Sequence, residues 1–248
     1  MVSVVHSVAA QSDFEQFFST LAEGLGAAEV AALRDAVAYA WERYGEEVLG
    51  SGERIWSHAL GMAVIIAGLK LDADSRMAAV LFAVPAHDEK GIAHIEEHYG
   101  KPVADLVNGI SRLHKLRPIT KGFVAANLEA GDGNPAEVKA QVEVLRKMLL
   151  AMVEDIRVVL LRLASRTQTL RFYVAHQDDD LRAQVARETL ELYSPLANRL
   201  GVWELKWELE DLSFRFLHPD VYKKIAGMLD EKRSEREQFI ADAVKSVR

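Results

Sequence analysis

Apolar residues recur every three or four positions along most of this chain, and stretches in which apolar and polar residues alternate are scarce. A repeat near 3.6 residues is typical of helices that bury one face, whereas alternation is typical of half-buried strands. The sequence therefore predicts an all-α fold built as a helical bundle. One run predicts a central, largely buried helix, with apolar positions at Met148, Met152, Ile156, Val159, Leu160 and Leu163.

Capping residues indicate where some of these helices begin and end. Asp74-Ser75 can cap the helix that runs to Leu81, because short side-chain oxygens accept hydrogen bonds from first-turn amides. His218-Pro219 predicts the end of one helix and the start of another, since proline is tolerated in a first turn.

Two breaks divide the chain. Glycine and proline at 131–135 predict a flexible linker, and Ser194-Pro195 marks a change of character after Tyr193. We expect the helices that follow to form a connecting unit in which at least one tryptophan is buried, because aromatic side chains dominate packing. The aromatic residues of that unit are Trp203, Trp207, Phe214 and Phe216.

Composition narrows the class of protein. The chain has 248 residues, of which 50% are hydrophobic, so it can bury a sizeable core. It has no cysteine, which excludes disulfides and thiolate chemistry. The start lacks the basic region of a signal peptide, and no apolar run approaches the roughly 20 residues of a membrane span, so we expect a cytoplasmic protein without a membrane partner. The net charge of -7 argues against a broad basic face, and direct nucleic-acid binding is not expected.

Several motifs resemble the RelA/SpoT family of (p)ppGpp synthetases and hydrolases. The longest is ETLELYSPLANRLGV at 188–202, which continues as KWELEDL and FRFLHP. The others are MLLAM at 148–152 with DIRV at 155–158, and IEEHYG at 95–100 with LVNGI at 106–110. The match runs from about Ser51 to the end of the sequence and is poor over the first 50 residues, for which we expect an N-terminal helical segment at 1–50. The resemblance implies an HD-type hydrolase domain at 51–193 and a helical connector at 194–248 leading to a synthetase domain.

In that family the hydrolase domain removes the 3′-pyrophosphate of ppGpp with a manganese ion, and the resemblance places its site on this chain. The first histidine ligand falls on His58, which is retained. The central His-Asp pair falls on Phe82-Ala83, and the distal aspartate falls on Ser165. The other family positions are changed as well: the water-activating Glu-Asp pair falls on Ala86-His87, and two nucleotide contacts fall on Leu49 and Thr169.

Most metal ligands and both water-activating carboxylates are therefore absent, as in the RelA-type branch of the family, whose hydrolase domain is inactive. The resemblance implies a degenerate HD domain acting as a pseudo-hydrolase and regulatory region, with no catalytic residue and no cofactor in this segment. The parent would be a GTP pyrophosphokinase of the stringent response, which transfers pyrophosphate from ATP to GTP or GDP. Its expected partners are the synthetase domain of the parent chain and the ribosome, reached through downstream domains. The sequence stops at Arg248, before the synthetase motifs.

Two other functions stay open at this stage. An active phosphohydrolase could use a rearranged metal site of His58, His87 and Asp88. Pro85 lacks a backbone donor and clashes with the preceding turn, so we expect His87-Asp88 to lie on a connection. Alternatively, a helical module could hold a nucleotide without cutting it, because basic side chains attract phosphates. The candidates for that role are Arg54, Arg112, Lys115, Arg146, Arg166 and Arg171.

Overall fold

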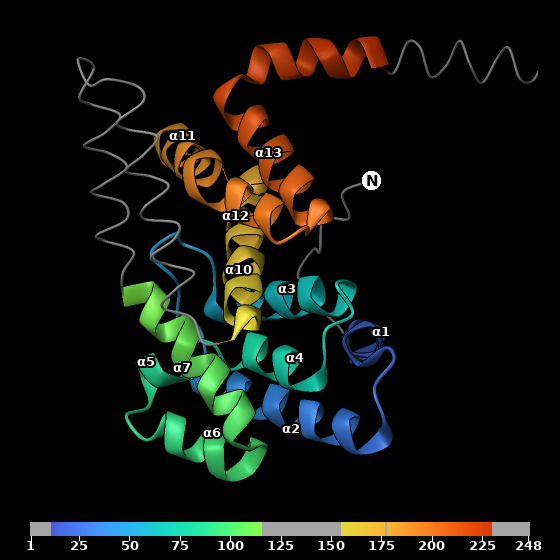
Figure 1. Cartoon of the computed structure of the whole chain (residues 1–248), viewed down its shortest axis with the longest axis vertical. Helices are drawn as coiled ribbons and strands as arrows, with labels where there is room; N and C mark the ends of the chain where they lie inside the picture. Colours follow the sequence, from blue (N-terminus) through green and yellow to red (C-terminus); the bar gives the residue numbers. More distant parts are fainter. Residues whose placement is uncertain (1–10, 116–154, 177, 230–248) are drawn as a thin grey trace, which may run out of the picture.

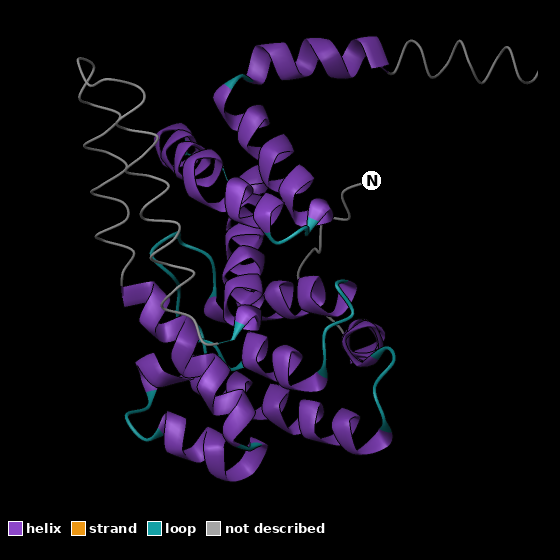
Figure 2. Cartoon of the chain, viewed as in Figure 1, coloured by secondary structure: helices purple, strands orange, loops and turns teal. Residues whose placement is uncertain are grey.

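The computed structural model describes residues 11–115, 155–176 and 178–229, and most of these lie in helices (Figure 2). The described residues contain no β-strand beyond an isolated bridge that joins Val48 to Arg54. The all-α prediction is therefore confirmed for this part of the chain. Its elements are α1 (Gln11–Ala22), α2 (Ala27–Tyr44), α3 (Ile55–Gly68), α4 (Ala73–Val80), α5 (Val84–His87), α6 (Gly91–Tyr99), α7 (Lys101–Lys115), α10 (Ile156–Ala175), α11 (Asp179–Glu188), the π-helix η1 (Thr189–Tyr193), α12 (Ser194–Arg199) and α13 (Trp203–Leu217), followed by a helix at 219–229.

Helix α10 is the central element of the molecule. In Figure 1 it runs between a group formed by α1 to α7 and a second group formed by α11 to α13. Helices α3 and α7 pack against it from the first group, and α11 and α13 pack against it from the second. Its residues Leu161, Leu163 and Leu170 are fully buried. A shift of α10 would therefore change the packing of both groups of helices.

Helix α10 begins later than the apolar pattern predicts. Asp155 has an extended backbone, and its side chain accepts a hydrogen bond from the Arg157 amide, so Asp155 is the N-cap and not a helical residue. Ile156 is 50% exposed, whereas Val159 and Leu163 are buried. The prediction of one continuous buried helix is therefore wrong at Asp155, and its earlier part and the predicted linker at 131–135 lie outside the described residues.

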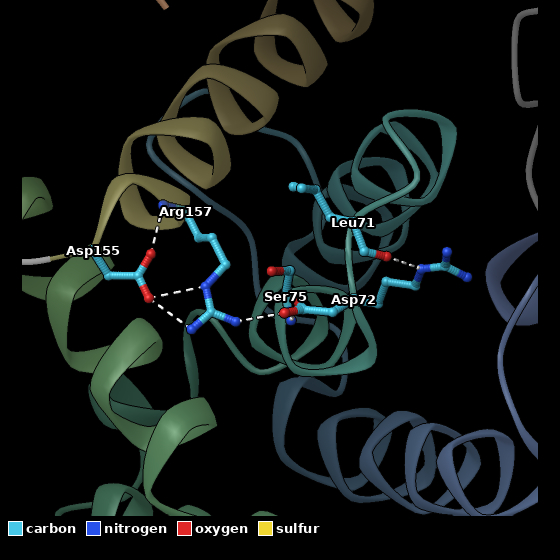
Figure 3. A network of polar contacts seen from close by, with 6 residues as sticks. Leu71, Asp72, Ser75, Asp155 and Arg157 are labelled. Carbon is cyan, nitrogen blue, oxygen red and sulfur yellow. Dashed lines mark hydrogen bonds and ion pairs between the residues drawn. The ribbon is translucent and has the colours of Figure 1, made fainter.

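A polar network ties the start of α10 to the start of α4 (Figure 3). Asp72 caps α4, because its Oδ1 accepts a hydrogen bond from the Ser75 amide at 3.0 Å, so the prediction that Asp74 forms this cap is wrong. Nη1 of Arg157 lies 2.6 Å from Asp72 Oδ2, and Nη2 lies 2.6 Å from Asp155 Oδ2. One guanidinium group thus joins the capping carboxylates of two helices that are far apart in the sequence.

The C-terminal helices bury leucines and expose both tryptophans. The predicted break at His218 is confirmed, because α13 ends one residue earlier and 219–229 forms a further helix. Trp203 is 52% exposed and Trp207 is 64% exposed, so the expectation of a buried tryptophan is wrong. Helical phase explains this result, since Trp207 lies about 200° around the axis from the buried Leu205. The buried apolar residues of α13 are Leu205, Leu209 and Leu212.

Candidate functional site

The positions expected to hold the central metal ligands lie in the short link between α4 and α5. Phe82 is 5% exposed and Ala83 is 8% exposed, so an aromatic ring and a methyl group occupy this part of the interior. Tyr44 of α2 supports the link: its hydroxyl donates to the Val80 carbonyl at 2.7 Å and accepts from the Ala83 amide at 3.2 Å. Burial raises the pKa of Tyr44 well above its usual value, so its side chain is a neutral phenol that can make both bonds.

His58 lies in the first turns of α3 and is 1% exposed. Its Nδ1 is 2.7 Å from Oε2 of Glu53, and its Nε2 is 2.9 Å from Oγ of Ser165 on α10. Because an ionised carboxylate only accepts hydrogen bonds, we assign the proton to Nδ1, so that Nε2 accepts from the serine hydroxyl. The Phe82 ring lies 5.4 Å from the imidazole, centroid to centroid. Both nitrogens of the remnant histidine are thus engaged by protein side chains.

Gln168 completes this group of side chains. It lies three residues after Ser165, on the same side of α10, and its Nε2 donates to Oε1 of Glu53 at 2.6 Å. The amide passes directly over Gly61 of α3, where an added Cβ would lie 2.1 Å from Gln168 Oε1. Glycine at position 61 therefore allows the glutamine to reach the buried carboxylate.

The polar partners of His87 and Asp88 are different residues from those of this buried group. His87 is the last residue of α5, a single turn that contains Pro85, and Asp88 comes directly after it. His87 Nδ1 is 3.0 Å from Oε2 of Glu47, and Asp88 lies 3.7 Å from Nε of Arg43. Among the described residues, no group of three or more histidine, cysteine, aspartate or glutamate side chains is arranged to hold a metal ion. The described structure therefore does not assemble His58, His87 and Asp88 into a rearranged metal site.

The basic candidates are scattered, and those with contacts in the structure face carboxylates. The pairs are Arg54 with Glu46, Arg166 with Glu188, and Arg171 with Glu208. Arg166 is 2% exposed and its guanidinium carbon lies 4.2 Å from the centre of the Tyr193 ring, so a phosphate cannot reach it. Arg112 is exposed on α7, while the Lys115 side chain and Arg146 lie outside the part of the chain that the structure describes.

The two positions aligned with family nucleotide contacts, Leu49 and Thr169, make short-range hydrogen bonds within the protein. The amide of half-buried Leu49 donates to the Glu53 carbonyl at 2.8 Å. The Thr169 hydroxyl donates to the backbone carbonyl of Ser165 at 3.0 Å, within its own helix. Neither side chain brings a charge that could bind a phosphate.

Sequence reasoning missed Glu53, Gln168 and Tyr44. Glu53 precedes α3 by a few residues, and only the fold turns its side chain back toward His58. Gln168 gave a usable signal, since a residue three positions after Ser165 shares its side of a helix. Tyr44 gave none, because its hydroxyl bonds backbone groups 36 and 39 residues away.

Comparison with known proteins agrees with this fold. A family profile described as HD domain matches residues 36–203. GTP pyrophosphokinase of Haemophilus influenzae is 36% identical over 186 residues, which are 75% of this chain and 23% of that protein. Guanosine-3′,5′-bis(diphosphate) 3′-pyrophosphohydrolase of the same species is 41% identical over 190 residues, 77% of this chain and 26% of that protein. The bifunctional (p)ppGpp synthase/hydrolase SpoT of Escherichia coli is 36% identical over 219 residues, 88% of this chain and 29% of that protein.

The chain spans between 23% and 29% of the length of these relatives. A solved structure of a metazoan SpoT orthologue shares 17% identity at a TM-score of 0.46 and covers 75% of this chain and 94% of that one, a likeness too remote to add to the sequence matches. No helix among the described residues combines the length and the apolar character needed to cross a bilayer. The chain belongs to the HD-domain family and is homologous to the RelA/SpoT enzymes of (p)ppGpp metabolism.

Proposed function

We propose that this chain is a catalytically inactive pseudo-hydrolase and regulatory region of a RelA-type (p)ppGpp synthetase, acting in the cytoplasm without a metal cofactor of its own. Its relatives carry the names of GTP pyrophosphokinases and of ppGpp hydrolases. The residues at the candidate site favour the first group, because they lack the chemistry of hydrolysis.

One observation carries the proposal: Nε2 of His58, the one expected metal ligand that is retained, lies 2.9 Å from the hydroxyl of Ser165, the position expected for the distal aspartate ligand. A manganese ion prefers carboxylate and water oxygens and would use them to activate a water molecule. The groups around His58 are the Ser165 hydroxyl, the Phe82 ring and the Glu53 carboxylate, whose two oxygens face His58 Nδ1 and Gln168. This set does not offer a divalent cation the free oxygen ligands that it prefers.

The positions expected to activate water support the same conclusion. Ala86 is exposed and carries no polar group. His87 is engaged by Glu47 at 3.0 Å and is an imidazole where the family resemblance expects a carboxylate. General-base catalysis needs a base within hydrogen-bond reach of the attacking water, and neither residue supplies a carboxylate for it.

The test is to measure manganese content and ppGpp hydrolysis on the same purified protein, with a bifunctional relative such as Escherichia coli SpoT as the positive control. We expect no stoichiometric manganese and no release of pyrophosphate. Hydrolysis that is abolished by His58→Ala would contradict the proposal and favour a rearranged site. Tight binding of ppGpp without cleavage, measured by calorimetry, would favour a nucleotide-binding module.

Restoring hydrolysis should require at least five changes together: Phe82→His, Ala83→Asp, Ala86→Glu, His87→Asp and Ser165→Asp. Metal, base and substrate must all be in place, so any one change leaves too few ligands. We expect no activity from each single variant in the manganese-dependent assay. Activity from Phe82→His alone would show that the site is far less degraded than we propose.

The assignment to a RelA-type synthetase concerns the parent protein. We expect a protein that includes the sequence following Arg248 to transfer pyrophosphate from ATP to GTP, and to reach the ribosome through further domains. This expectation rests on the relatives, which are more than three times as long as the matched region. Absence of transfer under any activating condition would contradict the synthetase assignment.

A further inference from the structure

We infer that Glu53, His58, Ser165 and Gln168 form a buried polar cross-link that fixes α3 to α10 and holds this part of the domain in one conformation without a metal ion. The statement that no metal ion is needed rests on the proposed function, whereas the cross-link itself rests on the geometry of these four residues.

The hydrogen bonds of the cross-link form an unbroken chain. Gln168 Nε2 donates to Glu53 Oε1 at 2.6 Å, and Glu53 Oε2 faces His58 Nδ1 at 2.7 Å. His58 Nε2 then faces Ser165 Oγ at 2.9 Å. The chain leaves α10 at Gln168, passes through the turn before α3 and through α3 itself, and returns to α10 at Ser165. The chain therefore holds α10 at two points three residues apart: Gln168 is bonded to the turn before α3, and Ser165 is bonded to α3 itself.

Burial makes this chain of bonds costly to open. Three of its four members are buried, with Glu53 2% exposed, His58 1% exposed and Ser165 2% exposed, while Gln168 is half-buried. Removing one member leaves a buried partner without a hydrogen bond, and the free energy lost is then the desolvation cost of that partner. The Phe82 ring beside His58 and the close passage of Gln168 over Gly61 leave little freedom for rearrangement.

The cross-link lies next to the contact between α10 and the C-terminal helix α13. Three residues after Gln168, Arg171 makes two hydrogen bonds to the carboxylate of Glu208 on α13, at 2.5 and 2.8 Å. The side chains that pin α10 to α3 thus lie one helical turn from those that attach α13.

The first experiment compares two hydroxyl deletions on the same helix. Ser165→Ala removes the cross-link hydroxyl, whereas Thr169→Val removes a hydroxyl that bonds only a carbonyl of its own helix. On protein treated with a chelator, we expect Ser165→Ala to raise the unfolding equilibrium constant by about tenfold, which corresponds to about 1.4 kcal/mol. Thr169→Val should change it by less than about threefold. Equal effects would overturn the cross-link.

The second experiment asks whether the members act as a unit. The side chains of Ser165 and Gln168 are linked through His58 and Glu53, so the Ser165→Ala, Gln168→Leu double variant should fall short of the product of the single effects by at least about twofold. The imidazole ¹⁵N spectrum of His58 should show protonation at Nδ1 alone. Full additivity together with protonation at Nε2 would contradict the inference.

A manganese titration of the same sample separates this inference from the proposed function. Suppose that the double variant shows coupling and His58 is protonated at Nδ1, but manganese binds and the protein hydrolyses ppGpp. The proposed function then fails, and the cross-link of the metal-free protein stands. If manganese does not bind and the coupling is absent, the cross-link fails and the proposed function stands.

Discussion

Replacing Arg157 by methionine should destabilise the fold, because this one side chain joins the N-terminal caps of α4 and α10. Its guanidinium contacts Asp72 at 2.6 Å and Asp155 at 2.6 and 2.9 Å. Methionine keeps much of the apolar stem and removes only the charge and the hydrogen bonds. The substitution therefore isolates the polar contribution of the network in Figure 3.

The magnitude follows from the exposure of the three side chains. Exposed ion pairs contribute about 0–1 kcal/mol, whereas hydrogen bonds to charged groups contribute about 1.5–3 kcal/mol. Arg157 is 25% exposed, but Asp72 is 50% exposed and Asp155 is 38% exposed, so solvent screens both contacts. We expect a total loss of about 1–3 kcal/mol. For a chain of this size each kcal/mol lowers the unfolding temperature by roughly 2–4 °C.

The loss should also depend on pH. Hydrogen bonds from Arg157 lower the pKa of Asp155; the pKa of Asp72 is lowered too, because hydrogen bonds from Ser75 and Arg157 outweigh the opposing effect of burial. A carboxyl group with a lowered pKa in the folded state stabilises the fold above its unfolded pKa, near 3.8. This stabilisation begins to decline once the pH is below that value and is lost as the pH falls through the lowered pKa of the folded state. The difference between the wild type and Arg157→Met should therefore shrink below about pH 4.

Urea unfolding at pH 7 and at lower pH would measure both effects. The matched control is Lys101→Met, because Lys101 pairs with Asp105 and both side chains are more than half exposed. We expect the control to change stability by less than about 0.5 kcal/mol. The reasoning would be refuted if the two variants lost equal stability, or if the loss in Arg157→Met did not change with pH.

Four further substitutions test the packing by the same unfolding assay. Trp207→Ala should cost less than about 0.5 kcal/mol because the ring is 64% exposed, while Leu209→Ala on the buried face should cost about 2–5 kcal/mol; equal losses would contradict the orientation of α13. Tyr44→Phe should cost about 1–3 kcal/mol, since it leaves a buried carbonyl and a buried amide without their partner, and no change would mean that other groups satisfy them. Gly109→Ala should cost about 1–3 kcal/mol, because the added methyl carbon would lie 2.7 Å from a Val158 methyl group, and a neutral result would show that Val158 moves aside.

The helical periodicity was sufficient to predict the fold class, but it did not fix helix boundaries or orientation. The start of α10 depends on Asp155, whose side chain accepts hydrogen bonds from the amide and the guanidinium of Arg157. Arg157 in turn donates to Asp72, the N-cap of α4, a contact that no local pattern contains. The Trp207 error has a different origin. Large aromatic size favours burial, but the leucines of α13 occupy the core-facing side, and a helix cannot bury both sides against one neighbour.

The candidate site was predictable as a set of positions and not as a set of contacts. The family resemblance marked His58 and Ser165, and the structure brings these two side chains together at 2.9 Å. It did not mark Glu53 or Gln168, because their importance comes from a buried hydrogen-bond chain that exists only when α3 and α10 are packed. The pairing of Gly61 with Gln168 is likewise visible only in three dimensions.

The uncharged residues at the degenerate positions stabilise the fold together, because each avoids a buried charge in a site without a cation. A carboxylate at position 83 or 165 would be buried, since Ala83 is 8% exposed and Ser165 is 2% exposed. Without a cation such a charge costs several kcal/mol, and at position 165 it would also face Nε2 of His58, while Glu53 already occupies Nδ1. Ala83 and Ser165 avoid that cost, and the Phe82 ring adds about 1.5–3 kcal/mol of apolar burial. Each single reversion toward a metal ligand therefore works against the stability of the fold, and the substitutions stabilise the pseudo-site as a group.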